Sequence, residues 1–371
     1  MTASVPPAPG LPAARAGSAV PLGPLTTLGV GGPADRLVVA GDEAALLAAV
    51  ADADAAGRPL LLLGGGSNVV VADDPVRGDV VAIRTRGTVD REDRGPDGAP
   101  RVLRTVAAGE PWDDVVAASV RDGLAGLECL SGIPGAAGAT PIQNVGAYGP
   151  EVADTIVGVR LLDRGTGEVL AVPAAELGFA YRHSALKGRQ DRVVLDVTFA
   201  LEPSPLGAPV RYGELARRVG AEGGERVPAG ELRDAVLGLR RGKGMVLDPG
   251  DPDTRSAGSF FTNPILDDAA FAALVARVAD RLGADAPPPP AYPGGPGRTK
   301  TSAAWLIERA GFARGHARDG AAISSKHTLA LTSRGGGAAA VLGLAHEVAD
   351  GVREAFGVAL VPEPVLVGAS W

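Results

Sequence analysis

The chain contains very little cysteine. Cys129 is its single cysteine among 371 residues, so no intrachain disulfide can form, and no second thiol is available to complete a cysteine-based metal site. Only four histidines are present, without an H-x-x-x-H spacing or a cluster, which leaves a zinc centre without ligands. The sequence therefore predicts no metal site, and its cysteine content fits a reducing cytoplasm.

Long apolar runs and an excess of positive charge are also missing. No segment reaches about 18 uninterrupted apolar residues, and residues 1–20 lack the apolar core of a signal peptide, so we expect neither membrane insertion nor export. The 36 basic and 43 acidic residues give a net charge of −7, which argues against a protein that neutralises many nucleic-acid phosphates. An anionic small molecule would need a locally basic pocket.

The pattern along the chain predicts an α+β protein with two domains. Residues 1–20 are rich in Pro and Ala and are expected to be a disordered lead. Strand and helix patterns alternate over 21–205, and helical patterns dominate 206–371. Predicted strands cover 34–40, 60–63, 69–71, 80–85, 102–109, 155–163, 167–173 and 191–201; predicted helices cover 42–57, 111–124, 211–220, 229–242, 266–282, 302–311 and 336–356. The polar segment 90–100 is interpreted as a hairpin loop, and the Pro/Gly segment 283–297 as a loop too irregular for helix or strand.

Two glycine-rich stretches are candidates for binding an anion or a cofactor. LLLLGGGSNVVV (60–71) places three glycines, a hydroxyl and an amide between apolar runs, so backbone N–H groups could turn toward a phosphate; an ordinary tight turn is the alternative. LSGIPGAAGATPIQNVGAYG (130–149) has five glycines and no charged side chain, which favours a wall against a cofactor over a solvated loop. Neither stretch matches the dinucleotide or P-loop glycine patterns.

Two basic clusters and one serine complete the candidates. YRHSALKG (181–188) and LRRGKG (239–244) suggest an anionic ligand in an acidic protein, although solvated basic turns are the alternative for each. AGSFFTNP (257–264) presents Ser259 without the G-x-S-x-G elbow and without a recognisable base, which argues against a serine nucleophile.

Taken in order, LGGGSNVVV, SGIPGAAGATPIQNVGAYG, YRHSALKG, AGSFFTNP and VPEP (361–364) resemble the UDP-N-acetylenolpyruvoylglucosamine reductase family over about residues 21–368. The resemblance implies a vanillyl-alcohol-oxidase-type FAD-binding fold at 21–205 and a substrate-binding domain at 206–371, whose last residues pack back on the FAD domain. It implies a cytoplasmic enzyme of peptidoglycan precursor synthesis that reduces UDP-N-acetylglucosamine enolpyruvate with NADPH, through non-covalent FAD and without an obligate protein partner. RYGEL and the loop carrying Tyr292 resemble the subfamily in which tyrosines close over the substrate.

The resemblance also assigns roles to individual residues. Ser259 matches the serine that protonates the substrate, and Arg182 and Glu363 match the other two catalytic residues. The positions that match contacts to FAD are Gly64, Gly65, Gly66, Ser67, Asn68, Ile133, Pro134, Gly135, Gly138, Gln143, Asn144, Gly146, Tyr148 and Arg240. Those that match contacts to the UDP-sugar are Tyr212, Lys243, Asn263, Tyr292 and His327.

Two other functions share part of this pattern. An oxidase of a sugar or hydroxy acid on the same flavin fold would keep the glycine motifs but would not need AGSFFTNP and VPEP. A non-catalytic binder of nucleotide sugars would keep Tyr212 and Lys243 but would gain nothing from the FAD stretches. A flavin absorption spectrum of the purified protein would distinguish a flavoenzyme from the non-catalytic binder, which needs no flavin.

Overall fold

The computed structural model describes residues 20–371, which form two compact units. Unit 1 contains residues up to Pro24, together with Pro33–Gly66 and Val76–Gly242; unit 2 contains Leu25–Gly32, Ser67–Pro75 and Lys243–Trp371. The helical segment 206–242 thus groups with unit 1, and two short early segments group with unit 2. The domain boundary at residue 205 stays a prediction, and the predicted lead lies outside the described residues except for Val20.

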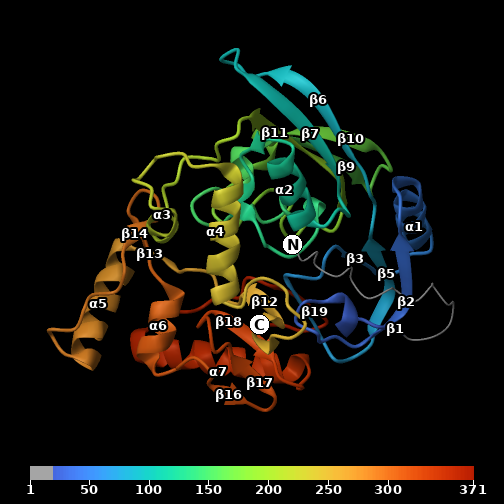
Figure 1. Ribbon diagram of the computed structural model, residues 1–371. Coiled ribbons are helices and arrows are strands. Elements are labelled where there is room, and N and C mark those ends of the chain that lie inside the picture. The colour runs from blue at the N-terminus through green and yellow to red at the C-terminus, as the bar shows by residue number, and fades with distance from the viewer. Residues whose placement is uncertain (1–19) are drawn as a thin grey trace. The chain divides into compact units, whose positions relative to one another are not determined.

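Unit 1 contains a small, mainly parallel sheet in the order β1-β2-β5-β3. Its strands are β1 (Val20–Pro21), β2 (Pro33–Ala40), β3 (Leu60–Leu63) and β5 (Val76–Ile83), of which only β1 is antiparallel to its neighbour. Helix α1 (Glu43–Ala55) packs on β2 and β5 (Figure 1). The predicted start of this helix is confirmed, because the Asp42 carboxylate accepts a hydrogen bond from the Ala45 N–H at 2.8 Å.

A second, antiparallel sheet of unit 1 has the order β10-β9-β11-β7-β6, with β8 paired to β11. Its strands are β6 (Thr88–Arg94), β7 (Pro100–Ala107), β8 (Leu124–Ala125), β9 (Ile156–Asp163), β10 (Val169–Pro173) and β11 (Arg192–Pro203). The predicted strands at 102–109, 155–163, 167–173 and 191–201 are confirmed within a few residues. Trp112 and Phe199 are fully buried in the core of this sheet, with ring centroids 5.5 Å apart.

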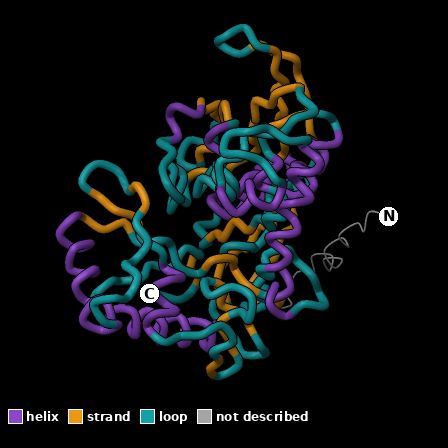
Figure 2. Tube along the Cα trace, turned by 60° about the vertical axis from the view of Figure 1, so that its left-hand side comes forward, coloured by secondary structure: helices purple, strands orange, loops and turns teal. Residues whose placement is uncertain are grey.

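The prediction for the polar segment 90–100 was wrong in part. Residues 88–94 form strand β6, and only 95–99 form the turn that projects beyond the sheet (Figures 1 and 2). The charges that suggested a loop are paired across the strands: Asp90 lies opposite Arg104, and Asp93 opposite Arg101. Cross-strand ion pairs allow a strand rich in charge to form at a sheet edge.

Three further helices of unit 1 pack together. They are α2 (Trp112–Arg121), α3 (Gly213–Val219) and α4 (Ala229–Gly242), which agree with the predicted helices. Helix α4 contacts α2, α3 and the short 3-10 helix η2 (Glu128–Leu130). The other 3-10 helices are η1 (Gly23–Leu25), η3 (Ala137–Ala139), η4 (Val152–Asp154), η5 (Ala174–Leu177) and, in unit 2, η6 (Pro252–Thr254).

Unit 2 is built around a four-stranded sheet in the order β12-β18-β17-β16, along which the long helix α7 packs (Figure 1). These elements are β12 (Ser256–Ser259), β16 (Ala317–Arg318), β17 (Ala321–Ile323), β18 (Ala330–Ser333) and α7 (Ala338–Phe356). The first turn of α7 is capped by a residue far away in the sequence. Asp73 accepts hydrogen bonds from the N–H groups of Ala338 (2.8 Å) and Ala339 (2.9 Å).

Two smaller sheets complete unit 2. One is the parallel pair β4 (Val69–Val71) and β19 (Val365–Val367); the other has the order β13-β15-β14, with β13 (Ile265–Asp267), β14 (Tyr292–Pro293) and β15 (Arg298–Lys300). Helices α5 (Asp268–Leu282) and α6 (Ala303–Ala310) agree with prediction. The Pro/Gly segment contains one short strand after all, β14, which tolerates Pro293 because it is an edge strand. No helix within residues 20–371 combines the length and apolar character needed to cross a bilayer.

Candidate active site

The two glycine-rich loops of unit 1 are in backbone contact. A Cβ atom built on Gly65 would lie 2.5 Å from the Cα atom of Gly135, and one on Gly138 would lie 2.4 Å from the Cβ atom of Ala108. Gly66 has a φ of 63°, which side-chain-bearing residues rarely adopt. Gly65, which is predicted to approach a cofactor, therefore also lets the two loops meet, and Gly138 lets the second loop approach Ala108.

Partly buried polar groups hold these loops in place. Arg84 Nη1 donates to the carbonyls of Ile83 (2.8 Å) and Gly64 (2.9 Å), where the first loop leaves β3. Burial and the charge of Arg86 lower the pKa of Arg84 below its usual range. Sequence reasoning missed Arg84, because an arginine at the end of a strand carries no pattern of its own.

The second loop is held at its start by α2 and α4. Asp113 accepts two hydrogen bonds from Arg233, at 2.7 and 2.9 Å, and a third from the N–H of Gly132 at 2.6 Å. Burial acts to raise the pKa of Asp113, but Arg233 and the Gly132 N–H outweigh it and lower the pKa. The backbone N–H of Trp112 also donates to the Gly135 carbonyl at 3.0 Å. The loop is thus fixed at Gly132 and Gly135, where its predicted flavin contacts begin.

Arg182 lies against the end of this loop. Its Nη2 donates to the Gly146 carbonyl at 2.7 Å, its Nη1 to the Asn144 carbonyl at 3.3 Å, and Nη1 approaches Glu151 Oε1 at 3.5 Å. Arg182, Asn144 and Tyr148 have φ values of 51°, 51° and 54°, a left-handed conformation that is uncommon for residues other than glycine. Such strain is typical of functional sites, where the surrounding structure over-determines the backbone.

Aromatic and cationic side chains surround Tyr148. Its ring meets that of Tyr212 edge-to-face, with centroids 5.5 Å apart. Burial raises the pKa of Tyr148 to about 12, so its hydroxyl stays protonated at neutral pH. Arg240, on α4, is near enough to Tyr148 to interact electrostatically, and burial lowers the pKa of this arginine. The structure therefore brings together the predicted FAD residues Tyr148 and Arg240 with the predicted substrate residue Tyr212.

In unit 2, Ser259 is the last residue of β12. Gly258 before it has a φ of 77°, and the register of β12 against β18 shifts between Ser256 and Ser259. Phe260 and Phe261 after it are fully buried, as core packing predicts. Ser259 is therefore held at an irregular strand end.

Glu363 is held next to that strand. Its N–H donates to the Phe260 carbonyl at 2.8 Å, and its own carbonyl accepts from Asn68 Nδ2 at 3.3 Å. Asn68 thus groups with Glu363 in unit 2. The sequence pattern places residues 64–68 together as contacts to the cofactor. In the structure, Gly64–Gly66 belong to unit 1, and Ser67 and Asn68 belong to unit 2.

The predicted substrate residues of unit 2 lie on several elements. Asn263 Oδ1 accepts from the Ala303 N–H at 3.0 Å, at the start of α6. Tyr292 lies on β14, opposite Lys300, with half of its surface exposed. His327 lies two residues after Ser325. The N–H of Ser325 and its hydroxyl both donate to the Asp253 carboxylate, at 3.1 and 2.5 Å.

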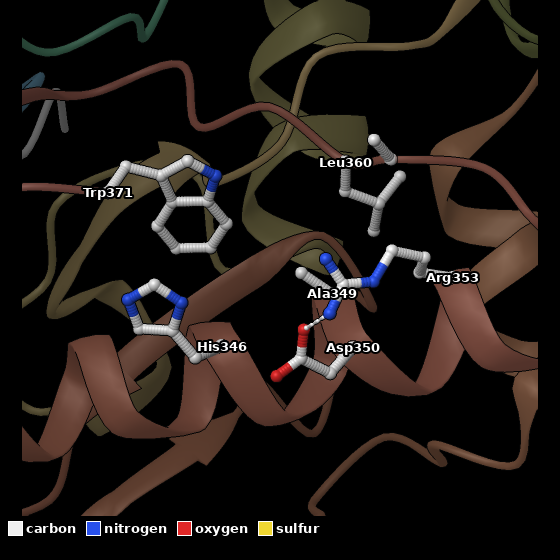
Figure 3. Close-up of a pocket in the computed structure, with 7 residues that line it drawn as sticks. His346, Ala349, Asp350, Arg353, Leu360 and Trp371 are labelled. Atoms are coloured by element: carbon white, nitrogen blue, oxygen red, sulfur yellow. Dashed lines mark hydrogen bonds and ion pairs between the residues drawn. The ribbon is translucent and has the colours of Figure 1, made fainter.

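A pocket of about 280 Å³ lies elsewhere in unit 2, and none of the predicted site residues lines it (Figure 3). Its residues are His346, Ala349, Asp350, Arg353, Ala359, Leu360 and Trp371. Trp371 stacks on His346, with centroids 4.2 Å apart, and its ring also contacts Phe261 at 5.9 Å. The Trp371 ring therefore connects this pocket to the core residue Phe261, which lies two residues after Ser259. Among the described residues, no group of three or more His, Cys, Asp or Glu could hold a metal ion.

Comparison with known proteins decides the family. A family model described as "UDP-N-acetylenolpyruvoylglucosamine reductase, C-terminal domain" matches residues 251–367, and one described as "FAD binding domain" matches 34–172. The reductase of Streptomyces avermitilis is 58% identical, with 94% of each chain covered. The chain belongs to the UDP-N-acetylenolpyruvoylglucosamine reductase family.

Further relatives agree with this assignment. The reductase of Thermobifida fusca is 54% identical over 95% of this chain and 98% of its own. The crystal structure of UDP-N-acetylenolpyruvylglucosamine reductase from Thermus caldophilus is similar over 95% of this chain and 99% of that one, with a TM-score of 0.61 and 26% identity. The α+β fold class and the family resemblance are therefore confirmed, and this reductase family member is an FAD oxidoreductase.

The loops of unit 1 fit FAD on their own geometry. At Gly65 there is no room for a Cβ atom, so backbone rather than side chains lines the contact between the loops. No acidic side chain occurs from Ser131 to Pro150, and the half-buried Arg84 guanidinium lies at the Gly64 carbonyl. Closely packed glycine backbone near a half-buried arginine cation suits a pyrophosphate.

Proposed function

We propose that this protein reduces UDP-N-acetylglucosamine enolpyruvate to UDP-N-acetylmuramate, with NADPH as the reductant and non-covalent FAD as the cofactor. The observation that supports it most directly is the hydrogen bond from the Glu363 N–H to the Phe260 carbonyl. It places the two motifs AGSFFTNP and VPEP side by side in unit 2, and these are the motifs that an oxidase on a flavin fold would not need. The reaction belongs to peptidoglycan precursor synthesis in the cytoplasm.

Within this proposal, unit 1 holds the cofactor. Gly64–Gly66, Ile133–Gly135, Gly138 and Gln143–Tyr148 offer backbone and amide groups to FAD, with Arg240 near the flavin. When bound, FAD carries hydride from NADPH to the terminal carbon of the enolpyruvyl group. Ser67 and Asn68, which precede β4, are assigned to FAD by the family resemblance alone. Gly65 matters because a larger residue would push the two loops apart, and Gly138 matters because a larger residue would collide with Ala108.

Arg182 stabilises the negative charge that develops on the substrate. Hydride addition leaves charge on the neighbouring carbon and its carboxylate, and a guanidinium already fixed by two carbonyls needs no reorganisation to meet it. One preorganised donor of this kind contributes about 3–4 kcal/mol of transition-state stabilisation.

Ser259 then donates a proton to the carbon next to the carboxylate, which carries the negative charge after hydride addition. A serine hydroxyl is a weak acid, but a carbanion-like centre is a strong base, and a positioned proton donor contributes about 10²–10⁴ in rate. Glu363 supports this step as a protonated acid or as the partner of a cation or water, because an unpaired carboxylate would repel the enolate. Tyr212, Lys243, Asn263, Tyr292 and His327 bind the UDP-sugar.

The decisive experiment measures NADPH oxidation with and without UDP-N-acetylglucosamine enolpyruvate. We expect a purified protein with a flavin spectrum that turns over NADPH at a substantial rate only when the enolpyruvyl substrate is added. Oxygen-dependent flavin turnover with a sugar or hydroxy acid would point to an oxidase instead. A colourless protein that binds no added FAD would point to a binding protein and would overturn the proposal.

A further inference from the structure

Glu151 is the first charged residue after the long uncharged loop, and its side chain folds back onto that loop. Its carboxylate accepts a hydrogen bond from Asn144 Nδ2 at 2.7 Å and lies 3.5 Å from Arg182 Nη1. Gly146 pairs with Glu151 in an isolated antiparallel bridge, and a Cβ atom at Gly146 would lie 2.8 Å from Glu151 Cγ. One carboxylate therefore contacts two residues of the candidate site.

The residues that Glu151 contacts are those with unusual backbone conformations. Asn144 and Arg182 both have φ values of 51°. Asn144 connects its own loop to the segment that carries Arg182, because its side chain donates to the Ala180 carbonyl at 3.1 Å. The Arg182 carbonyl accepts from Lys187 Nζ at 2.9 Å. Glu151 brings a carboxylate to these contacts, and its negative charge faces the Arg182 guanidinium where the two segments meet.

We propose that Glu151 is a positioning residue: its carboxylate fixes the Arg182 guanidinium and the Asn144 amide so that Arg182 meets the charge developing on the substrate. This inference rests on the proposed function, in which Arg182 stabilises the enolate. A guanidinium has five N–H donors, so contact with Glu151 along one edge is compatible with an anionic substrate at another. Nothing in the sequence resemblance assigns Glu151 a role.

Glu151 also has a local structural role, which the experiment must separate. It forms a capping box with Asp154 at η4, in which the Glu151 N–H donates to Asp154 Oδ2 at 2.9 Å. Glu151→Gln keeps an oxygen for capping and for Asn144 but removes the charge that faces Arg182. Asp154→Asn perturbs the same capping box and leaves the Glu151 carboxylate in place, so it is the matched control.

The test compares parent, Glu151→Gln and Asp154→Asn by rapid kinetics and by calorimetric substrate titration. In Glu151→Gln we expect flavin reduction by NADPH and the substrate Kd to stay within about threefold of the parent, and flavin reoxidation by substrate to slow by about 10- to 100-fold, because a displaced group loses alignment with the reacting atoms. Asp154→Asn should reoxidise within about threefold of the parent. A reoxidation rate near the parent's in Glu151→Gln, or an equal loss in Asp154→Asn, would overturn the inference.

A double-mutant cycle supplies the second readout. If Glu151 acts through Arg182, Glu151→Gln should cause no further loss of reoxidation rate in an Arg182→Ala background. Fully additive losses would show that Glu151 acts elsewhere and would overturn the inference. A parent protein without substrate-dependent NADPH oxidation would overturn the proposed function and this inference with it, whereas an active parent with an equally active Glu151→Gln would overturn only the latter.

Discussion

The backbones of Gly65 and Gly135 touch, so closely that a Cβ atom at Gly65 would lie 2.5 Å from Gly135 Cα. Gly65→Ala must therefore push the two cofactor loops apart. We expect it to weaken FAD binding at least about tenfold, measured by titrating the apoprotein with FAD and following flavin fluorescence, because the backbone donors lose their common orientation.

Gly64→Ala is the matched control for Gly65→Ala. A Cβ atom at Gly64 would meet the Ala136 Cβ atom at 3.5 Å, an ordinary van der Waals distance. We expect FAD affinity within about threefold of the parent. Equal losses in both variants would contradict the argument from close approach.

Ser259→Ala tests the proton donor. We expect flavin reduction by NADPH to stay nearly normal and flavin reoxidation by substrate to slow by at least about 10², because only the second step needs a proton from this hydroxyl. Stopped-flow absorbance separates the two steps. Thr262→Ala removes a hydroxyl from the same segment and should change neither rate more than about threefold; reoxidation within a few-fold of the parent in Ser259→Ala would make the assigned role wrong.

Asp113→Asn tests the anchor of the second glycine loop and its pH dependence. The net effect of burial, Arg233 and the Gly132 N–H is to lower the pKa of Asp113 on folding. A carboxylate with a depressed folded pKa stabilises the fold above its unfolded pKa of about 3.9, and this contribution is lost as pH falls through the folded value. We expect Asp113→Asn to lower the free energy of unfolding by about 1–3 kcal/mol at pH 7.

The difference between parent and Asp113→Asn should shrink below about pH 4, as followed by urea unfolding at several pH values. Asp114→Asn, at the exposed neighbouring position, is the control and should change stability by less than about 0.5 kcal/mol. A difference that persists unchanged at pH 3 would show that the charge of Asp113 does not matter.

Asp73→Ala tests the long-range cap of α7. Removal of a carboxylate that accepts two N–H groups at a helix start should lower the free energy of unfolding by about 0.5–2 kcal/mol. Asp74→Ala, at the exposed position next to it, should have a much smaller effect. Equal destabilisation in the two variants, measured by urea unfolding, would contradict a specific capping role.

The single thiol provides a probe of unit 1. Burial, with a smaller effect of Glu128, raises the pKa of Cys129 to about 12. Since the thiolate is the reactive form, a disulfide reagent at pH 8 should label native protein at least about 10³ times more slowly than urea-unfolded protein, whose thiol has a pKa near 8.5. Fast labelling of the native protein would show that unit 1 opens around Cys129.

Local pattern was enough to locate most helices and strands, because apolar spacing and caps are properties of neighbouring residues. The Asp42 cap of α1 and the bounds of α4 were predictable for this reason. The strand β6 was not, because its charges become acceptable only opposite Arg101 and Arg104 on β7. Motifs shared with a family located Ser259, Arg182 and Glu363 as candidates.

Contacts between distant segments were beyond the reach of the pattern. Nothing local marks Asp73 as the cap of a helix 265 residues later, or Arg84 as the anchor of Gly64. Glu151 looks like any acidic residue after a loop until the fold brings Asn144 and Arg182 onto its carboxylate. Spacing along the chain encodes elements and motifs, whereas the partners of a buried charge depend on which segments the hydrophobic core brings together.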